Sequence, residues 1–295
     1  MKKLLAIAIA AGLAAPMAVM ADTTLYGKMK VSVGSDKTAG VKTTTVNAHS
    51  SRLGVKGSTA MDNGMSVTYK LEMATKGIID ANGSLGARDS WVGLKGSFGE
   101  VRVGRHATPY ALSSDMFDML NIGHQNISDG AAGFRVNNAI AYLKGYGPVG
   151  IAAAYVPDET AGVNNDATSL LGSYKSNGIK AALGYQKIKN VEKAFNLGLG
   201  YKFPAGHAVN YVYNQIEDTG TSVKTKNSAL NGRYKFGKAY VQAEIGKTKG
   251  LSGANTVVEL GYGLGKGTTV WTSIGENDIG TKDNSHARVG ITSNF

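Results

Sequence analysis

The chain closes with the stretch His286-Ala287-Arg288-Val289-Gly290-Ile291-Thr292-Ser293-Asn294-Phe295. Val289, Ile291 and Phe295 fall on one face of an extended strand, because successive side chains of a strand point to opposite faces. A soluble domain has no physical need for an aromatic residue at its end, since chain termini usually fray. The stretch therefore predicts a terminal β-strand of the kind that closes a transmembrane barrel, provided that the rest of the chain is exported and built of similar strands.

The first 21 residues have the features of a secretory signal peptide. Lys2 and Lys3 precede an apolar run at residues 4–15, and Ala21 is a small residue at the expected cleavage point. A membrane anchor is the alternative, but the run is shorter than the ~20 residues of a spanning helix, and no later segment reaches that length. We expect cleavage after Ala21, which leaves residues 22–295 as a single barrel domain.

The composition fits a membrane barrel better than a secreted soluble enzyme. The chain has 40 Gly, 5 Pro and no Cys, so an exported form would have no disulfide bonds. A closed, hydrogen-bonded barrel is another route to stability. The mean hydropathy of −0.13 agrees with this reading, because lipid-facing apolar and lumen-facing polar residues average to near neutral.

The chain is basic, with a formal net charge of +11, which becomes +9 once Lys2 and Lys3 leave with the signal peptide. Nucleic-acid binding is one reading of such a charge. The basic residues are spread along alternating strands instead of forming a cluster, so we expect no nucleic-acid partner. Basic residues that line a lumen and lie in surface loops explain the positive net charge better.

Apolar and polar residues alternate in long rows, as in residues 25–33, 66–73 and 197–201, without a long helical stripe outside the signal peptide. Seven short turns alternate with eight longer polar loops, which gives fifteen connections and sixteen strands. The short turns lie at residues 59–64, 96–99, 145–148, 176–178, 203–206, 236–238 and 264–267, and the longer loops at 35–46, 76–86, 107–133, 156–167, 188–193, 216–225, 249–254 and 276–285.

This pattern predicts an all-β fold, a transmembrane antiparallel β-barrel with sixteen strands. Single-chain bacterial barrels have an even number of strands, short periplasmic turns and longer outside loops. Fourteen or eighteen strands remain open, because strand boundaries are uncertain by about two to four residues. Inside lipid, every backbone N–H and C=O group must be hydrogen-bonded within the protein. We therefore expect the first strand, residues 23–34, to pair with the last, residues 286–295, so that no sheet edge remains.

Aromatic residues lie close to the short turns, and in a barrel they would form a girdle at the membrane interface. In a soluble β-sandwich the same residues would be ordinary core aromatics. The residues concerned are Phe98, Phe203, Phe236 and Tyr240.

The third long loop, residues 107–133, is the longest and carries apolar residues such as Met116, Phe117 and Leu120. Apolar residues in a long loop indicate that it packs against something. A sixteen-stranded barrel has a lumen wide enough for an aqueous channel, so this loop could fold into the lumen and narrow it. Asp115 and Asp118 would then face the passage. An external loop packed on its neighbours is the alternative.

Four cations are expected to point into the lumen from nearby strands: Lys28, Arg52, Arg88 and Arg135. An Arg or Lys facing lipid at the membrane midplane costs about 2–4 kcal/mol, which favours the inward direction. The alternative for each is an ordinary solvated charge of the barrel wall. Strict alternation from Arg88 turns Asp89 and Trp91 outward, and Arg105 also falls on the outer face.

Several short motifs carry a resemblance to a known family. They are Thr24-Leu25-Tyr26-Gly27-Lys28, Ser51-Arg52-Leu53-Gly54-Val55-Lys56-Gly57, Trp91-Val92-Gly93-Leu94-Lys95-Gly96, Val103-Gly104-Arg105 and the terminal Phe295. In their order and spacing the chain resembles the general, non-specific porins of Gram-negative outer membranes. The resemblance covers the mature chain and implies a homotrimer of sixteen-stranded barrels in outer-membrane lipid, each with its third loop folded into the pore.

The resemblance also implies roles for particular residues. Lys28, Arg52, Arg88 and Arg135 would form a basic ladder that faces Asp115 and Asp118 across the pore constriction. Opposed charges of this kind set a transverse field that favours polar solutes. Arg105 would contact the second loop of a neighbouring subunit, with Asp80 as its partner, and Phe295 would be the signal read by the barrel-assembly machinery. The chain departs from the family at Ser293 and in Ser114-Asp115-Met116-Phe117-Asp118-Met119, where a Pro-Glu-Phe-Gly turn is frequent.

No enzyme motif is complete, because Gly246-Lys247-Thr248 lacks the upstream glycine of a phosphate loop and the five His lack metal-ligand spacing. We therefore expect no enzyme, cofactor or metal. The sequence favours a pore for passive diffusion of small hydrophilic solutes and ions. A surface adhesin or receptor barrel is one alternative, although such a protein would favour longer outer loops than most of those found here. A solute-specific channel is another, and for a sugar it would need a row of aromatic residues along the lumen, whereas the inward rows here are mostly polar and charged.

The sign of the ion selectivity depends on which charges dominate the lumen. The excess positive charge and the further inward candidates Lys30, Lys56 and Arg102 favour a weak anion preference. The same ladder would serve a cation-preferring pore if the loop acids dominated.

Overall fold

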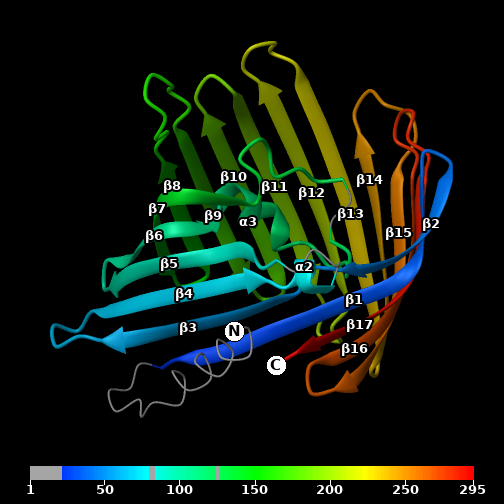
Figure 1. Ribbon diagram of the computed structural model, residues 1–295, viewed down its shortest axis with the longest axis horizontal. Helices are drawn as coiled ribbons and strands as arrows, with labels where there is room; N and C mark the ends of the chain where they lie inside the picture. The colour runs from blue at the N-terminus through cyan, green and yellow to red at the C-terminus, as the bar shows by residue number, and fades with distance from the viewer. Residues whose placement is uncertain (1–21, 80–83, 124–125) are drawn as a thin grey trace.

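The computed structural model describes residues 22–79, 84–123 and 126–295. The predicted signal peptide, residues 1–21, lies outside the described residues. Antiparallel strands wrap around a central space, and the first and last strands run side by side (Figure 1).

The described residues form seventeen strand segments and two short helices. The strands are β1 (Thr24–Thr38), β2 (Val41–Ala48), β3 (Arg52–Ala60), β4 (Ser66–Ala74), β5 (Gly86–Gly96), β6 (Gly99–Ala107), β7 (Arg135–Tyr146), β8 (Val149–Val156), β9 (Ala167–Ser176), β10 (Ile179–Ile188), β11 (Glu192–Lys202), β12 (Ala208–Asp218), β13 (Lys224–Phe236), β14 (Ala239–Thr248), β15 (Asn255–Gly265), β16 (Thr268–Asn277) and β17 (Asn284–Asn294). The helices are α2 (Lys76–Ile79) and α3 (Pro109–Asp115). Within the described ranges no helix is long and apolar enough to cross a membrane.

The barrel closes with sixteen strands, because β2 and β3 are two halves of one wall strand. Both lie on the same side of β1, where Val31 pairs with Ala48 of β2 and Lys28 pairs with Arg52 of β3. Residues 49–51 interrupt this wall strand. On its other side β1 pairs with β17, with Val31 opposite Ile291. The predicted all-β antiparallel barrel, its strand number and the pairing of the first strand with the last are confirmed.

Two predicted loops are shorter than the sequence indicated. The loop expected at residues 35–46 is wrong, because β1 and β2 continue as a hairpin to Thr38 and Val41. The turn between them consists of Ala39 and Gly40, with φ of 49° and 85°. Positive φ at both central positions matches the twist of the flanking strands, so the hairpin needs no longer loop. The loop expected at residues 188–193 is likewise a tight connection between Ile188 and Glu192.

The two faces of the barrel wall differ in polarity, with large apolar side chains on the outer face and polar or small side chains on the other. On β10, Leu183 and Tyr185 are exposed on the outer face, while Ala182 and Gln186 are buried on the other. We call the face with the buried polar and small residues the polar face. Apolar side chains exposed in the isolated chain would be covered by lipid, and closure leaves the backbone groups paired.

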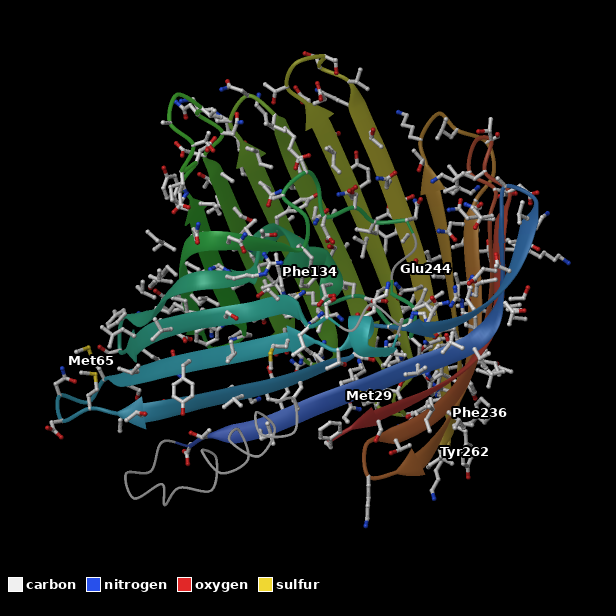
Figure 2. The ribbon with its side chains drawn as sticks, viewed as in Figure 1. Met29, Met65, Phe134, Phe236, Glu244 and Tyr262 are labelled. Atoms are coloured by element: carbon white, nitrogen blue, oxygen red, sulfur yellow. The ribbon has the colours of Figure 1, made fainter. Side chains whose placement is uncertain are left out.

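The aromatic residues near the short turns fall into two groups. Phe98, Phe203 and Phe236 are exposed. Phe236 and Tyr262 lie at the same end of the barrel, on either side of β14 (Figure 2). Tyr240, expected in the same girdle, instead turns to the polar face, where its hydroxyl accepts a hydrogen bond of 3.0 Å from the Asn121 side chain.

Gly27 contacts the terminal residue where the barrel closes. The Gly27 amide donates to the Phe295 carbonyl at 2.8 Å, and the Phe295 amide donates to the Gly27 carbonyl at 3.1 Å. The Phe295 ring lies over Gly27, where a Cβ would be 2.3 Å from a ring carbon. A larger residue at this position would displace the terminal ring from the first strand.

Between β6 and β7, residues 108–123 and 126–134 form a long segment that packs on the polar faces of several strands. It starts with α3, whose first turn is capped by the Thr108 hydroxyl accepting from the Ala111 amide at 3.0 Å. Asparagine side chains of the wall then donate to its backbone: Asn196 to the Tyr110 carbonyl at 3.1 Å and Asn210 to the Phe117 carbonyl at 2.9 Å.

Candidate functional site

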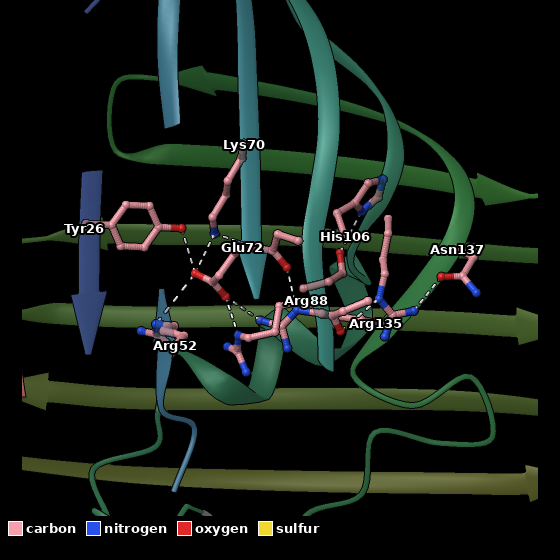
Figure 3. Close-up of polar contacts among 12 residues, drawn as sticks. Tyr26, Arg52, Lys70, Glu72, Arg88, His106, Arg135 and Asn137 are labelled. Atoms are coloured by element: carbon pink, nitrogen blue, oxygen red, sulfur yellow. Dashed lines mark hydrogen bonds and ion pairs between the residues drawn. The ribbon is translucent and has the colours of Figure 1, made fainter. Parts of the chain in front are cut away.

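A buried carboxylate on β4 gathers cations from the neighbouring strands. Glu72 has a side chain that is 3% exposed and forms an ion pair with Arg88. Arg52 and Arg135 bring guanidinium nitrogens to 3.7 and 3.8 Å of its oxygens, and the Tyr26 hydroxyl donates to it at 2.8 Å. We call the following set the Glu72 cluster: Tyr26, Arg52, Lys70, Glu72, Arg88, Asp89 and Arg135. Figure 3 labels all of these residues except Asp89.

A second carboxylate in the cluster, Asp89, forms ion pairs with Lys70 and Arg135. The outward direction predicted for Asp89 is wrong. The register between β4 and β5 shifts between Leu71 and Met73, so that Arg88 and Asp89 together lie opposite Glu72. A β-bulge of this kind places two adjacent residues opposite one, which interrupts alternation.

The bulge also reverses the direction of the residues that follow it. Trp91, expected on the outer face, turns to the polar face. There the guanidinium carbon of Arg102 lies 4.0 Å from the centre of its ring. Strict alternation fails at Asp89 and Trp91 because the sequence alone does not reveal the extra residue in β5.

Sequence reasoning missed two members of the cluster, Lys70 and Glu72. The signal was present, because both fall in the polar row of residues 66–73 that alternates with apolar residues. Glu72 affects the net charge of the cluster, because it lies among four cations and neutralises part of their charge. A buried carboxylate is tolerated only when it is paired in this way.

The predicted acids of the long segment border the same cavity as the cluster. Asp115 ends α3, and Asp118 accepts a hydrogen bond of 2.9 Å from the Leu120 amide. A cavity of about 510 Å³ is lined by both acids together with Arg52, Arg88 and Arg135. The structure thus brings three of the four predicted ladder cations and both predicted acids to one cavity. Their action as a pore constriction stays a prediction.

Lys28, the fourth predicted ladder cation, lies beside the cluster on β1. It pairs with Arg52 across the two strands, so the two residues share one face of the wall. Lys28 is not among the residues that line the 510 Å³ cavity.

Of the two residues predicted at the contact between subunits, the structure describes Arg105 but not Asp80. Arg105 on β6 is engaged within its own chain, where its guanidinium donates to the Asn137 side chain at 2.7 Å and to the Ala87 carbonyl at 3.4 Å. Asp80 lies outside the described residues. The subunit contact of both residues, like the assembly role of Phe295, stays a prediction.

The far part of the long segment is attached to β15 and β1. The Asn121 amide donates to Glu259 at 2.8 Å, and its side-chain nitrogen donates to the same carboxylate at 2.9 Å. Lys30 of β1 donates to the Asn121 carbonyl. Glu259 is fully buried. This attachment could not be predicted from the sequence, because its partners are far apart along the chain.

The near part of the segment is held by a neutral group. Burial raises the pKa of the Tyr110 hydroxyl, and the negative charges of Glu192 and Asp129 raise it further. Tyr110 therefore stays protonated at physiological pH, and its contact with the Asn214 amide does not depend on titration. In the parts of the chain that the structure describes, no group of three or more His, Cys, Asp or Glu side chains could hold a metal ion.

A comparison with protein families identifies the class. The family model of the Gram-negative porins matches residues 6–293. The chain therefore belongs to the Gram-negative porin family, whose members are outer-membrane channel proteins and not enzymes.

Relatives with similar sequences carry names that agree with this family. The major outer membrane protein P.IB of Neisseria meningitidis serogroup B is 26% identical over 96% of this chain and 95% of that protein. Outer membrane porin protein 32 of Delftia acidovorans is 26% identical over 92% of this chain and 88% of that protein. P.IB of Neisseria sicca is 34% identical, but that match spans only 43% of this chain and 37% of that protein.

Solved structures share the fold. An anion-selective porin from Comamonas acidovorans superposes with a TM-score of 0.80 at 18% identity, covering 94% of this chain and 100% of that chain. A mutant of the Rh. blastica porin gives a TM-score of 0.75 at 19% identity, covering 92% of this chain and 100% of that chain.

Proposed function

We propose that the protein forms a water-filled channel for passive diffusion of small hydrophilic solutes and ions across the outer membrane, with a weak preference for anions. The observation that carries the proposal is the Glu72 cluster on the polar face of the wall. It combines four cations with two carboxylates, so positive charge remains in excess. The similarity to a porin described as anion-selective supports the same sign.

The constriction lies, in this proposal, between the basic ladder and the long segment folded into the lumen. Lys28, Arg52, Arg88 and Arg135 form one side, and Asp115 and Asp118 form the other. The contacts of residues 108–134 with asparagines of the polar face support the position of the segment. The cavity of about 510 Å³ that both sides border supports the opposition of the charges.

The preference is weak because acids on the wall offset part of the ladder. Glu72 and Asp89 lie on the cationic side, so the field does not come from basic residues alone. Arg102, a further inward cation, is paired with Glu100 at 2.8 Å. A transverse field between partly neutralised charges orients polar solutes and discriminates modestly between ions.

Swelling of liposomes that contain the folded protein tests diffusion directly. We expect swelling in isotonic solutions of small neutral sugars, at rates that fall smoothly as the sugar becomes larger. A folded barrel that causes no swelling would contradict the channel and favour the surface adhesin or receptor. Swelling with one sugar and not with others of the same size would indicate a solute-specific channel.

We further propose that the channel is a homotrimer in outer-membrane lipid, with Arg105 and Asp80 at the contact between subunits. Phe295 serves as the signal for the barrel-assembly machinery. The exposure of the Phe295 ring beside Gly27 supports this role, because the terminal residue remains accessible at the edge of the wall.

A further inference from the structure

A second cavity lies beside the start of the long segment, next to the cavity that the Glu72 cluster borders. Its volume is about 200 Å³, and the residues that line it come from β5, β6, β7, β8 and α3. Asp89, Ala107 and Leu112 line both cavities, so the two spaces adjoin each other. We call the smaller space the side cavity.

A buried histidine lines the side cavity with one ring nitrogen unpartnered. His106 is 6% exposed and lies beside the Glu72 cluster (Figure 3). Its Nδ1 lies 3.0 Å from the Ala107 carbonyl oxygen, which can only accept, so Nδ1 carries the hydrogen. In the neutral ring Nε2 is then an acceptor, and within the described parts of the chain it is buried without a hydrogen-bond partner. Such an acceptor is destabilising until a donor reaches it.

The charged side chains at the side cavity are already paired within the chain. Asp89 forms ion pairs with Lys70 and Arg135. The Arg102 guanidinium lies 2.8 Å from the Glu100 carboxylate. A charged ligand would have to compete with these partners and give up its own hydration. The side cavity therefore favours an uncharged occupant.

Much of the remaining lining is apolar. Ala141 of β7 and Ala152 of β8 are buried, and their short side chains leave room for a ligand. The large apolar side chains of the lining are Trp91, Leu112 and Leu143. A cavity of about 150 Å³ is enough for benzene, so this one holds a single aromatic ring with a small substituent. Water fits such a lining less well, because a buried water needs about two to four polar partners.

We propose that the side cavity binds a small, uncharged molecule with one aromatic ring and one hydroxyl group, of the size of phenol. The hydroxyl donates its hydrogen to Nε2 of His106, which supplies the missing partner. The ring of the ligand packs on the alanines and on Trp91, because aromatic rings attract one another in offset or edge-to-face arrangements. The proposal concerns binding alone and does not depend on whether the protein conducts ions.

Fluorine NMR of the folded protein in detergent micelles tests the site, with 4-fluorophenol and fluorobenzene as probes. The two probes differ only in the hydroxyl group, and micelles without protein give the background from partition into detergent. We expect wild type to bind 4-fluorophenol with a dissociation constant of about 1 mM. Fluorobenzene binds about fivefold more weakly, because it has no hydrogen to donate to His106.

Two variants separate the hydrogen bond from the space. His106→Phe keeps an aromatic ring but removes Nε2, so we expect it to bind both probes with equal affinity. Ala152→Leu fills the side cavity, so we expect it to bind neither probe. His286→Phe is the matched control, because Nε2 of His286 on β17 is already engaged 2.9 Å from the Ser273 hydroxyl. This control keeps the fivefold preference for 4-fluorophenol.

Several outcomes would overturn the proposal. Equal affinity of wild type for the two probes, or a preference that survives in His106→Phe, would contradict the hydrogen bond to Nε2. Unchanged binding in Ala152→Leu would place the ligand elsewhere. Binding of neither probe beyond the micelle background would mean that the side cavity holds water only. If His106→Phe does not fold, the preference in wild type and the loss of binding in Ala152→Leu still decide.

The fluorescence of Trp91 gives an independent readout of the place of binding. The chain has two tryptophans, of which Trp91 lines the side cavity and Trp271 on β16 does not. We expect phenol to change the tryptophan emission of wild type and of His286→Phe, and to leave that of Ala152→Leu unchanged. An equal change in Ala152→Leu would mean that phenol acts from the micelle and not from the side cavity.

Discussion

At the scale of single residues, Glu72 sets the charge of the proposed pore wall. It is the acid around which Arg52, Arg88 and Arg135 converge, and in the described ion pairs only Arg135 among these three has a closer carboxylate, that of Asp89. A passing ion experiences the sum of these charges. In the proposed constriction, the ion selectivity therefore depends on an acid on the cationic side as much as on the ladder itself.

We expect Glu72→Gln to increase the anion preference. One unit charge about 6 Å from an ion in water is worth roughly 0.7 kcal/mol, with opposite sign for an anion and a cation. Screening at physiological salt reduces each value to about half, so the anion-to-cation permeability ratio rises about threefold. The measurement is the reversal potential in a planar bilayer under a KCl gradient. Glu276→Gln, an exposed glutamate on the outer face of β16, is the control and leaves the ratio unchanged. An unaltered reversal potential in the Glu72 variant would mean that the cluster does not line the path of the ions.

Individual side-chain directions were predictable from alternation only where the strands are regular. The polar rows correctly indicated that Arg52, Arg88 and Arg135 share one side of the wall, and they border one cavity. Asp89 and Trp91 were predicted on the wrong face, because a bulge depends on the register of two strands that are paired in space. The polar row of residues 66–73 indicated the inward direction of Glu72, but its role depends on partners from β3, β5 and β7 that only the strand pairing brings together.

At the scale of elements, the segment at residues 108–134 is held by hydrogen bonds instead of apolar packing alone. Asn196 and Asn210 donate to its backbone at one part, and Glu259 accepts from Asn121 at another. The sequence predicted a long loop that packs against something, because it contains apolar residues. The sequence could not show its partners, which lie about 80 to 140 residues further along the chain.

We expect Glu259→Gln to loosen the far part of this segment. The carboxylate accepts from both the amide and the side chain of Asn121, and hydrogen bonds to a charged group contribute about 1.5–3 kcal/mol each. Greater motion of the segment appears as larger current noise in the open state and as faster proteolysis between residues 116 and 123. Asp62→Asn, in the exposed turn between β3 and β4, is the control. Noise equal to wild type would show that the remaining contacts are sufficient.

A second prediction at this scale concerns the pair of strands that closes the barrel. Gly27→Ala pushes a methyl group into the Phe295 ring. Because this ring is exposed and can move aside, the substitution costs about 1 kcal/mol of unfolding free energy, the low end of the range for overpacking. In a double-mutant cycle the penalty disappears when Phe295→Ala is also present. Urea unfolding of the folded protein in detergent measures all four free energies. Additive effects of the two substitutions would contradict contact between them.

At the scale of the whole molecule, closure was the most predictable feature. An edge strand cannot remain unpaired in lipid, so an even series of alternating strands with short turns has to close on itself. The sequence did not reveal the break at residues 49–51 or the extension of the first hairpin to Thr38 and Val41, which depend on local backbone geometry. Sixteen strands followed nevertheless, because the turns could be counted without exact boundaries.

The proposed trimer has its own test. We expect Arg105→Ala to convert trimers to monomers in mild detergent at lower temperature than wild type, because a charge at the contact is lost. Size-exclusion chromatography with light scattering gives the masses, and Lys238→Ala, in a short turn, is the control. Dissociation at the wild-type temperature would indicate that Arg105 serves only its own chain, through Asn137.

The most direct test of the central claim is the conductance of the purified wild-type protein in a planar bilayer under a KCl gradient. The account predicts ohmic steps that close in threes and a reversal potential of the anion-selective sign, because the cations of the wall outnumber the acids beside them. A cation-selective sign would contradict the electrostatic account and leave a pore governed by Asp115 and Asp118. A folded barrel without any conductance would contradict the channel itself.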